Sequence, residues 1–265
     1  MVTTELLERW REDEAAGFEG WDFSYISGRS SQQAPPWSYR TRAVELVEAA
    51  RRLLDIDTGG GEFLASLAPL PAQSVAIESY RPNVAVARER LAPMIVDVHE
   101  VAVGAAWPVD DACFDLILNR QGHLNAPEIA RCLAPGGRFL TQQVGSGNLA
   151  DLTSLFGPAE SPAANKLSTV SAQLETHGLT IVRGEAWTGR QTFSDVGALV
   201  YFLKAIPWIV HGFSVDAHGA VLQALQALQA RTDAGAPLSF SIERFLIEAR
   251  APIGLPGRPR SVVRP

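Results

Sequence analysis

The sequence has few cysteines, no long apolar run and no excess of positive charge, and each absence excludes a class of protein. Cys113 and Cys132 are its two cysteines, and they lack metal-ligand spacing, so neither a metal site nor a disulfide framework is expected. No stretch reaches the roughly eighteen consecutive apolar residues that a membrane helix needs. The net charge of −6 provides no basic field of the kind that attracts nucleic acid.

The remaining composition is that of an ordinary globular chain. At 265 residues, with 46% hydrophobic and 20% charged residues, it can bury a full core as one large domain with an insertion. The N-terminus is amphipathic and acidic, unlike a signal peptide, and a cytoplasmic location is expected. The bias toward Ala, Arg, Gly and Pro predicts a bacterial source. A monomer or a homodimer is expected.

The segment 53–64 organises the rest of the chain. A short apolar run ends at Asp55, glycines 59–61 follow after Asp57, and an apolar segment resumes at Phe63. This order is typical of a buried strand, a tight turn and the start of a helix. Consecutive glycines let the backbone approach a ligand closely and adopt positive φ. The segment therefore predicts a ligand site at the end of a strand.

The charge of this segment indicates the kind of ligand. A dinucleotide fingerprint needs a third glycine where Leu64 stands, and the Gly-Lys-Ser/Thr end of a phosphate loop is also missing. Carboxylates at Asp55, Asp57 and Glu62 would repel a pyrophosphate. A cationic ligand without phosphate fits better, and S-adenosylmethionine (SAM), with its sulfonium and ammonium groups, is such a ligand.

At this turn the chain resembles the class I SAM-dependent methyltransferases, whose first motif reads approximately (Asp/Glu)-x-Gly-x-Gly-x-Gly. Asp55, Gly59 and Gly61 match the motif, and Asp57 stands where its first glycine should be. The run 133–137, Leu-Ala-Pro-Gly-Gly, resembles the family's LxPGG turn. The resemblance implies a Rossmann-like, doubly wound, mostly parallel sheet of seven strands in an α/β fold, with SAM as cofactor.

Apolar runs and turn signals locate the elements of this fold. Glycines 136 and 137 are expected to cap a helix and turn the chain into the next strand. The strands are expected at 53–56, 74–78, 94–98, 114–118, 138–144, 179–186 and 240–249. Helices are expected at about 4–16, 37–52, from 62, 83–91, 127–133, 163–177 and 196–208, with a further helix carrying Leu222, Leu225 and Leu228 on one stripe.

Glu78 is the second cofactor signal. It ends the second expected strand, seventeen residues after Gly61, and a carboxylate near that offset can accept hydrogen bonds from both ribose hydroxyls. The resemblance also implies that the segment around Ala102 holds the adenine. The expected cofactor-binding residues are Asp55, Asp57, Gly59, Gly61, Glu78, Ser79, Ala102 and Asn119.

Asp57 has two possible effects on SAM. A side chain at the first-glycine position would reach the methionine end of the cofactor, where a carboxylate attracts the ammonium and repels the carboxylate. If Asp57 is merely tolerated, Asp57→Gly should bind SAM at least as tightly as the wild type. If it holds the ammonium, the same change should weaken binding by more than about 1 kcal/mol. Tolerance is the favoured outcome.

Two segments are additional to a minimal seven-stranded core, and both are rich in aromatic residues. The expected organisation is an N-terminal helical lid that is not part of the sheet (1–36), a SAM-binding core (37–189), a helical insert over the acceptor (190–237), a last core strand (238–250) and a mobile tail (251–265). Trp21, Phe23 and Tyr25 in the lid, and Tyr201, Phe202, Trp208 and Phe213 in the insert, are candidates for the wall of an apolar acceptor pocket.

The expected activity is methyl transfer from SAM to oxygen or nitrogen of a small, partly apolar metabolite, as in secondary metabolism. His123, after the fourth strand, is the first candidate for a general base, and His211 in the insert is the second. Asn119 is followed by Arg120-Gln121 rather than Pro-Pro-aromatic, which disfavours nucleobase amines as acceptors. The alternatives are a SAM-fold protein that has lost transfer, suggested by Asp57, and an RNA methyltransferase.

Overall fold

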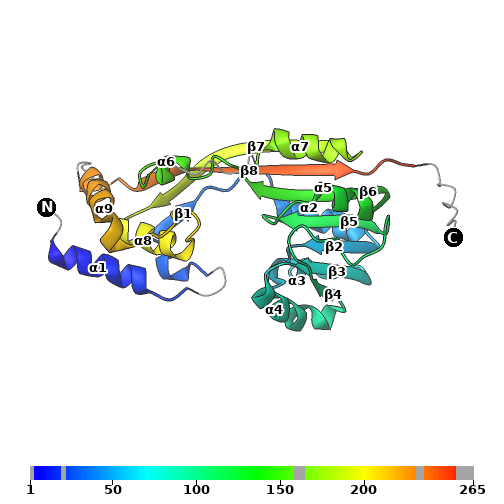
Figure 1. Ribbon diagram of the computed structural model, residues 1–265, viewed down its shortest axis with the longest axis horizontal. Helices are drawn as coiled ribbons and strands as arrows, with labels where there is room; N and C mark the ends of the chain where they lie inside the picture. Colours follow the sequence, from blue (N-terminus) through cyan, green and yellow to red (C-terminus); the bar gives the residue numbers. More distant parts are fainter. Residues whose placement is uncertain (1–2, 19–21, 158–164, 231–235, 255–265) are drawn as a thin grey trace. The chain divides into compact units, whose positions relative to one another are not determined.

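The computed structural model describes residues 3–18, 22–157, 165–230 and 236–254 (Figure 1). Trp21 and most of the expected tail lie outside these residues. Contacts divide the chain into two compact units. Unit 1 comprises Met1–Pro36, Gly145–Ala163 and Trp187–Glu243, and unit 2 comprises Trp37–Val144, Ala164–Ala186 and Arg244–Pro265. No helix among the described residues is both long enough and apolar enough to cross a membrane.

One mixed sheet has the strand order β1-β7-β8-β6-β5-β2-β3-β4, which is eight strands where seven were expected. The additional strand is β1 (Ser30–Gln32), within the segment that was predicted to lie outside any sheet. That prediction was wrong because Ser-Ser-Gln has no apolar alternation. The strand is held by antiparallel backbone pairing with residues 191–193 of β7 (Thr180–Phe193), which needs no particular side chains.

Unit 2 contains the parallel part of the sheet. Strand β2 pairs in parallel with β3 and β5, β3 with β4, and β5 with β6, while β8 (Leu238–Arg250) runs antiparallel to β6. The other elements of this unit are α2 (Tyr39–Ala49), β2 (Arg52–Ile56), α3 (Glu62–Ala65), β3 (Gln73–Glu78), α4 (Arg81–Leu91), the 3-10 turn η2 (Ala92–Met94), β4 (Asp97–Glu100), β5 (Phe114–Arg120), α5 (Ala126–Cys132), β6 (Leu133–Val144) and α7 (Leu167–Thr176).

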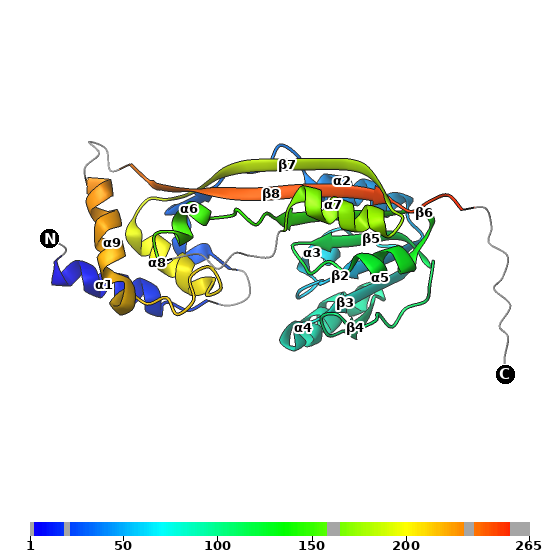
Figure 2. The same ribbon diagram turned by 45° about the horizontal axis from the view of Figure 1, so that its top comes forward.

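Helices cover both faces of this sheet. Leu54, Ile117 and Phe139 point to one face, where they share a buried cluster with Ile129 of α5 and Leu174 of α7. Side chains alternate between faces along a strand, so Glu248, next to Ile247 of that cluster, points to the opposite face. There Arg42 of α2 forms an ion pair with it at 2.8 Å. Figure 2 shows α5 and α7 on their common face. The doubly wound arrangement is as predicted.

Most expected elements of unit 2 are found, with three corrections. The third strand was expected at 94–98 but β4 begins at Asp97, because η2 and the left-handed Ile95 (φ 57°) occupy the intervening residues. Helix α5 ends at Cys132, and its C-cap Leu133 already has extended backbone, so glycines 136 and 137 turn the chain within β6 rather than capping the helix. Strand β7 continues seven residues beyond the expected end at Ala186.

Unit 1 has its own apolar core. It contains α1 (Thr4–Ala15), the 3-10 turn η1 (Ser24–Ile26), β1, α6 (Ala150–Thr153), α8 (Val196–Ala205) and α9 (Val215–Ala230). Trp10 of α1 is buried together with Phe193 and the apolar helix α8. The N-terminal segment and the insert, which were predicted to cover the acceptor together, pack into one unit; that they cover an acceptor stays a prediction.

Two side-chain predictions in unit 1 need correction. Leu222 and Leu225 are buried as expected, but Leu228 is 58% exposed, because Gln229 takes the inward position in the last turn of α9. Tyr201 and Phe213 were candidates for a pocket wall, yet both belong to the buried core. The aromatic residues there contact one another; the Tyr25 and Tyr201 rings, for example, are stacked with centroids 4.7 Å apart.

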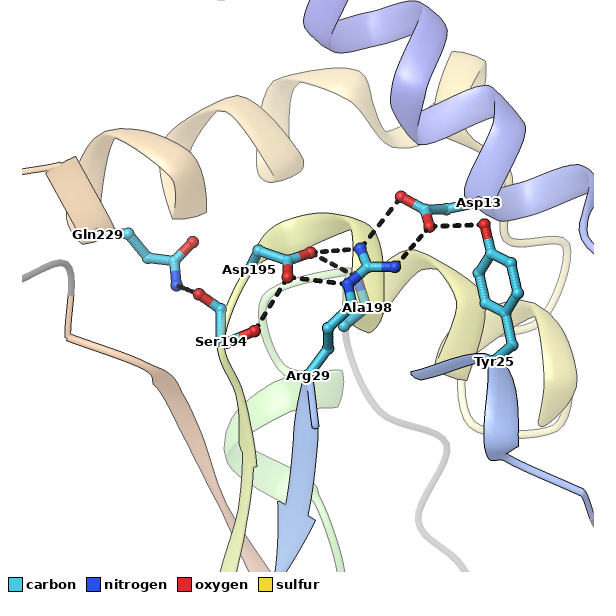
Figure 3. Close-up of polar contacts among 7 residues, drawn as sticks. All are labelled: Asp13, Tyr25, Arg29, Ser194, Asp195, Ala198 and Gln229. Carbon is cyan, nitrogen blue, oxygen red and sulfur yellow. Dashed lines mark hydrogen bonds and ion pairs between the residues drawn. The ribbon is translucent and has the colours of Figure 1, made fainter. Parts of the chain in front are cut away.

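A network of charges centred on Arg29 connects four elements of unit 1 (Figure 3). Its guanidinium donates to Asp13 of α1 and to Asp195, the N-cap of α8, with closest distances of 3.0 and 2.6 Å. The hydroxyl of Tyr25 in η1 donates to Asp13, and Asp195 also accepts from the backbone N–H of Ala198. Arg29 follows η1 and directly precedes β1, so the network joins these segments to both helices.

Candidate functional site

A pocket lies in unit 2 at the carboxyl ends of β2, β3 and β5, the edge of a doubly wound sheet where ligands bind. The enclosed cavity is small, about 20 Å³, and the space among its residues is about 310 Å³ when the open solvent above it is included. It is lined by Ile56, Asp57, Ile77, Glu78, Ser79, Val101, Ala102, Val103, Gly104, Trp107, His123 and Asn125. Of the ten residues predicted from sequence as cofactor-binding or catalytic, five are in this set: Asp57, Glu78, Ser79, Ala102 and His123.

Glu78 joins the glycine turn to the end of β3. Its two carboxylate oxygens accept hydrogen bonds from the backbone N–H groups of Gly59 (2.6 Å) and Tyr80 (2.7 Å). Burial raises the pKa of Glu78, and these two N–H groups oppose the shift because they stabilise the carboxylate. Each oxygen keeps a further lone pair for a ligand.

Gly61 is required by the shape of the same turn. Its φ of 80° is left-handed, and a Cβ at this position would lie 2.9 Å from Cγ of Leu91 in α4. A larger residue would therefore be strained and would also clash. Gly59 and Gly61 do not line the pocket themselves, and Gly59 reaches it through its hydrogen bond to Glu78.

Asp55 is buried at the carboxyl end of β2, behind the pocket rather than in its lining. Burial raises its pKa to about 7, and the carboxylates of Asp57 and Glu78 add to the increase because they disfavour a second negative charge. The neighbouring Thr58 hydroxyl opposes the shift. Among the described residues, the Thr58 hydroxyl is nevertheless the one buried side-chain oxygen that makes no well-formed hydrogen bond.

Asp57 stands directly after β2 in left-handed backbone, with φ of 52°. Its carboxylate connects the ends of the two neighbouring strands, because Oδ2 accepts from the backbone N–H of His123 (2.5 Å) and Oδ1 from the hydroxyl of Ser79 (3.3 Å). A Cβ on Gly122 would lie 2.5 Å from Cβ of Asp57, so the loop after β5 must be small at this point. Asp57 therefore has a structural role in the ligand-free turn.

Asn119 is part of the sheet and not of the pocket lining. Its side chain is fully buried, donates to the carbonyl of Ile56, and accepts from Thr141 (3.0 Å) and Gln143 (2.5 Å). These partners tie β5 to β2 and β6. Because its polar atoms are already hydrogen-bonded, Asn119 can act on a ligand only by fixing the strand ends.

The two candidate bases belong to different units. His123 is exposed and lines the pocket at the loop after β5. His211 is an exposed residue of unit 1, between α8 and α9. No group of three or more metal-binding side chains occurs among the described residues.

Sequence reasoning missed Trp107 and Asn125. Trp107 is a buried aromatic wall of the pocket, and its backbone N–H donates to Glu128, which also pairs with Arg131. Asn125 is the N-cap of α5 and accepts from the N–H of Glu128. Two signals were available in the sequence. Trp107 is the single large aromatic residue in a loop of mostly small apolar residues, and Asn125-Ala126-Pro127 is a helix start two residues after His123.

The chain is similar in part to methyltransferases. Residues 54–141 match the family model described as a methyltransferase domain. No curated protein sequence matches the chain. Among solved structures, YcgJ of Bacillus subtilis is 18% identical, with a TM-score of 0.56, over 82% of this chain and 99% of its own. A Bacillus halodurans protein described as a candidate methyltransferase has the same identity and TM-score, over 80% and 99%. A Deinococcus radiodurans protein of unknown function is 19% identical over 83% and 90%, with a TM-score of 0.58.

Proposed function

We propose that this chain is a class I SAM-dependent methyltransferase, that its pocket binds SAM, and that the methyl group passes to a small, partly apolar metabolite; the match of residues 54–141 to a methyltransferase domain supports the proposal. The observation that carries the proposal is the hydrogen bond between Gly59 and Glu78. This hydrogen bond holds the carboxylate of Glu78, which lines the pocket at the end of β3, against the glycine turn after β2.

The residues present suit the cofactor. Glu78 offers lone pairs to ribose hydroxyls, Asp57 offers a negative charge to the methionine end, and Val101 and Trp107 form an apolar side for the adenine. SAM when bound supplies an electrophilic methyl group. The chain itself has to position the acceptor and exclude water, and His123 is proposed to take the proton of an oxygen or nitrogen nucleophile.

A metabolite is favoured over nucleic acid as the acceptor because the net charge is −6 and no Lys or Arg occurs among the twelve residues that line the pocket. We propose a bacterial enzyme of secondary metabolism. A SAM-binding protein without transfer is the second candidate, since a carboxylate occupies the first-glycine position at Asp57. Incubation with labelled SAM and a panel of phenols, amines and carboxylic acids distinguishes the two.

Replacing Glu78 by Ala is expected to weaken SAM binding by about 1.5–3 kcal/mol, the range for hydrogen bonds to a charged group. The ribose would lose its acceptor, and the N–H of Gly59 would lose its partner. Isothermal titration with SAM measures the change. Glu100→Ala is the matched control, because Glu100 pairs in register with Glu78 on β4 but is exposed and does not line the pocket. Equal affinity of the Glu78 variant and wild type would exclude the proposed ribose contact.

A further inference from the structure

The pocket has an unusual charge balance. Asp57 and Glu78 contribute two carboxylates, and none of the twelve lining residues is Lys or Arg. The ion pairs of the described residues do not involve Asp57 either, so its carboxylate is held by two hydrogen bonds rather than by a cation. Each of its oxygens has a further lone pair available.

The cofactor and its product differ in charge. SAM has a sulfonium, an ammonium and a carboxylate, and thus a net charge of +1. S-adenosylhomocysteine (SAH) has lost the sulfonium charge with the methyl group and is neutral overall. The ammonium and the carboxylate are common to both, so their interactions with Asp57 largely cancel when the two affinities are compared. What remains is the interaction of the sulfonium charge with the pocket.

We propose, on the basis of the proposed function, that Asp57 determines cofactor specificity by favouring cationic SAM over neutral SAH. Methyl transfer then lowers the affinity of the pocket for its own product. Two contacts within the chain orient the carboxylate, the N–H of His123 and the hydroxyl of Ser79. Orientation in advance avoids the entropic cost of ordering a long charged side chain. A glycine at this position would provide neither the charge nor these contacts.

The ratio of the dissociation constants for SAH and SAM tests the proposal. In the wild type SAM should bind about five- to tenfold more tightly than SAH, as expected for one unit charge near a partly screened carboxylate. In Asp57→Asn, which keeps the size and an acceptor for His123, the ratio should fall to within about twofold of one. Sinefungin, which has an amine in place of the sulfonium methyl, should follow SAM rather than SAH in both proteins.

Two further variants separate charge from structure. Asp57→Gly should lower the ratio as Asp57→Asn does, because glycine accepts the φ of 52° and removes the charge together with the contacts. Glu62→Gln removes an acid of the same turn that pairs with Arg90 and does not line the pocket, and it should leave the ratio at the wild-type value. Thermal unfolding verifies that each variant is folded.

The outcomes are distinct. A wild-type ratio that persists in both Asp57 variants, or a wild-type ratio near one, would overturn the specificity role while leaving SAM binding intact. Loss of affinity for SAM and SAH by the same factor would assign Asp57 a structural role alone and would also overturn it. Absence of binding of every ligand to the wild type would overturn the proposed function, and this inference with it.

Discussion

Replacing Arg29 by Met is expected to destabilise unit 1 by about 2–4 kcal/mol and to abolish methyl transfer, while SAM affinity stays within a few-fold of wild type. The substitution would leave the carboxylate of Asp13 buried with Tyr25 as its remaining partner, and would remove the partner that Asp195 holds at 2.6 Å. Breaking a fully buried pair costs about 3–5 kcal/mol, and partial exposure of Arg29 reduces this value.

Urea unfolding of the full chain, followed by hydrogen exchange in α1 and α8, measures the effect. Arg11→Met is the matched control, because Arg11 pairs with Asp216 in the same unit at 2.7 Å but both side chains are mostly exposed, so the free energy of unfolding should hardly change. Gly197→Ala is an independent variant, since its Cβ would overlap Asp13 Oδ2. Full transfer activity in a protein whose α1 exchanges freely would contradict the predicted role of residues 1–36 in catalysis.

Replacing Asp55 by Asn should make the ligand-free protein more stable than wild type at pH 8 by up to about 4 kcal/mol. The pKa of Asp55 is about 7 in the folded chain against 3.8 for an unperturbed aspartate side chain, and each unit corresponds to about 1.36 kcal/mol. Between these values the folded chain binds more protons than the unfolded chain. The free energy of unfolding of the wild type therefore falls as the pH rises from about 4 to 7.

Urea unfolding of both proteins at pH 4, 5, 6, 7 and 8 without ligand checks this prediction. The difference between variant and wild type reports Asp55 together with its coupling to Asp57 and Glu78, because the remaining titrating groups are common to both. That difference should increase with pH up to about 7 and then remain constant. A difference independent of pH would mean that Asp55 is ionised throughout, which its burial beside Asp57 and Glu78 disfavours.

The sequence predicted the parallel part of the fold well, because buried strands such as 53–56 and 74–78 are apolar runs bounded by turn signals. It did not predict β1 or the full length of β7. Ser30–Gln32 is polar, and residues 188–192, Thr-Gly-Arg-Gln-Thr, contain no apolar side chain, so neither segment has an apolar run. Backbone pairing between distant segments determines both strands, and a local pattern does not contain that information.

The sequence also predicted part of the candidate site, five of whose lining residues were named in advance. Asp57, Glu78, Ser79, Ala102 and His123 line one pocket, because strand ends of a parallel sheet converge at one edge. The spacing of residues along the sequence could not reveal that the Asn119 side chain is hydrogen-bonded to neighbouring strands. A side chain at a strand end can face either the pocket or the sheet. The spacing also could not reveal Trp107, which is placed by the ion pair of Glu128 and Arg131 some twenty residues later.

Unit 1 is built from three segments that lie far apart in the sequence, and this affects the order in which its parts appear during translation. Helix α1 leaves the ribosome long before α8, but Trp10 of α1 is buried in one cluster with α8, whose residues begin at Val196. At synthesis rates of roughly 5–20 residues per second, α8 is synthesised on the order of ten seconds or longer after α1, and the apolar face of α1 stays uncovered during that time. A nascent chain arrested before α8 would therefore expose Trp10 and be a good substrate for chaperones, whereas one released after α9 would not.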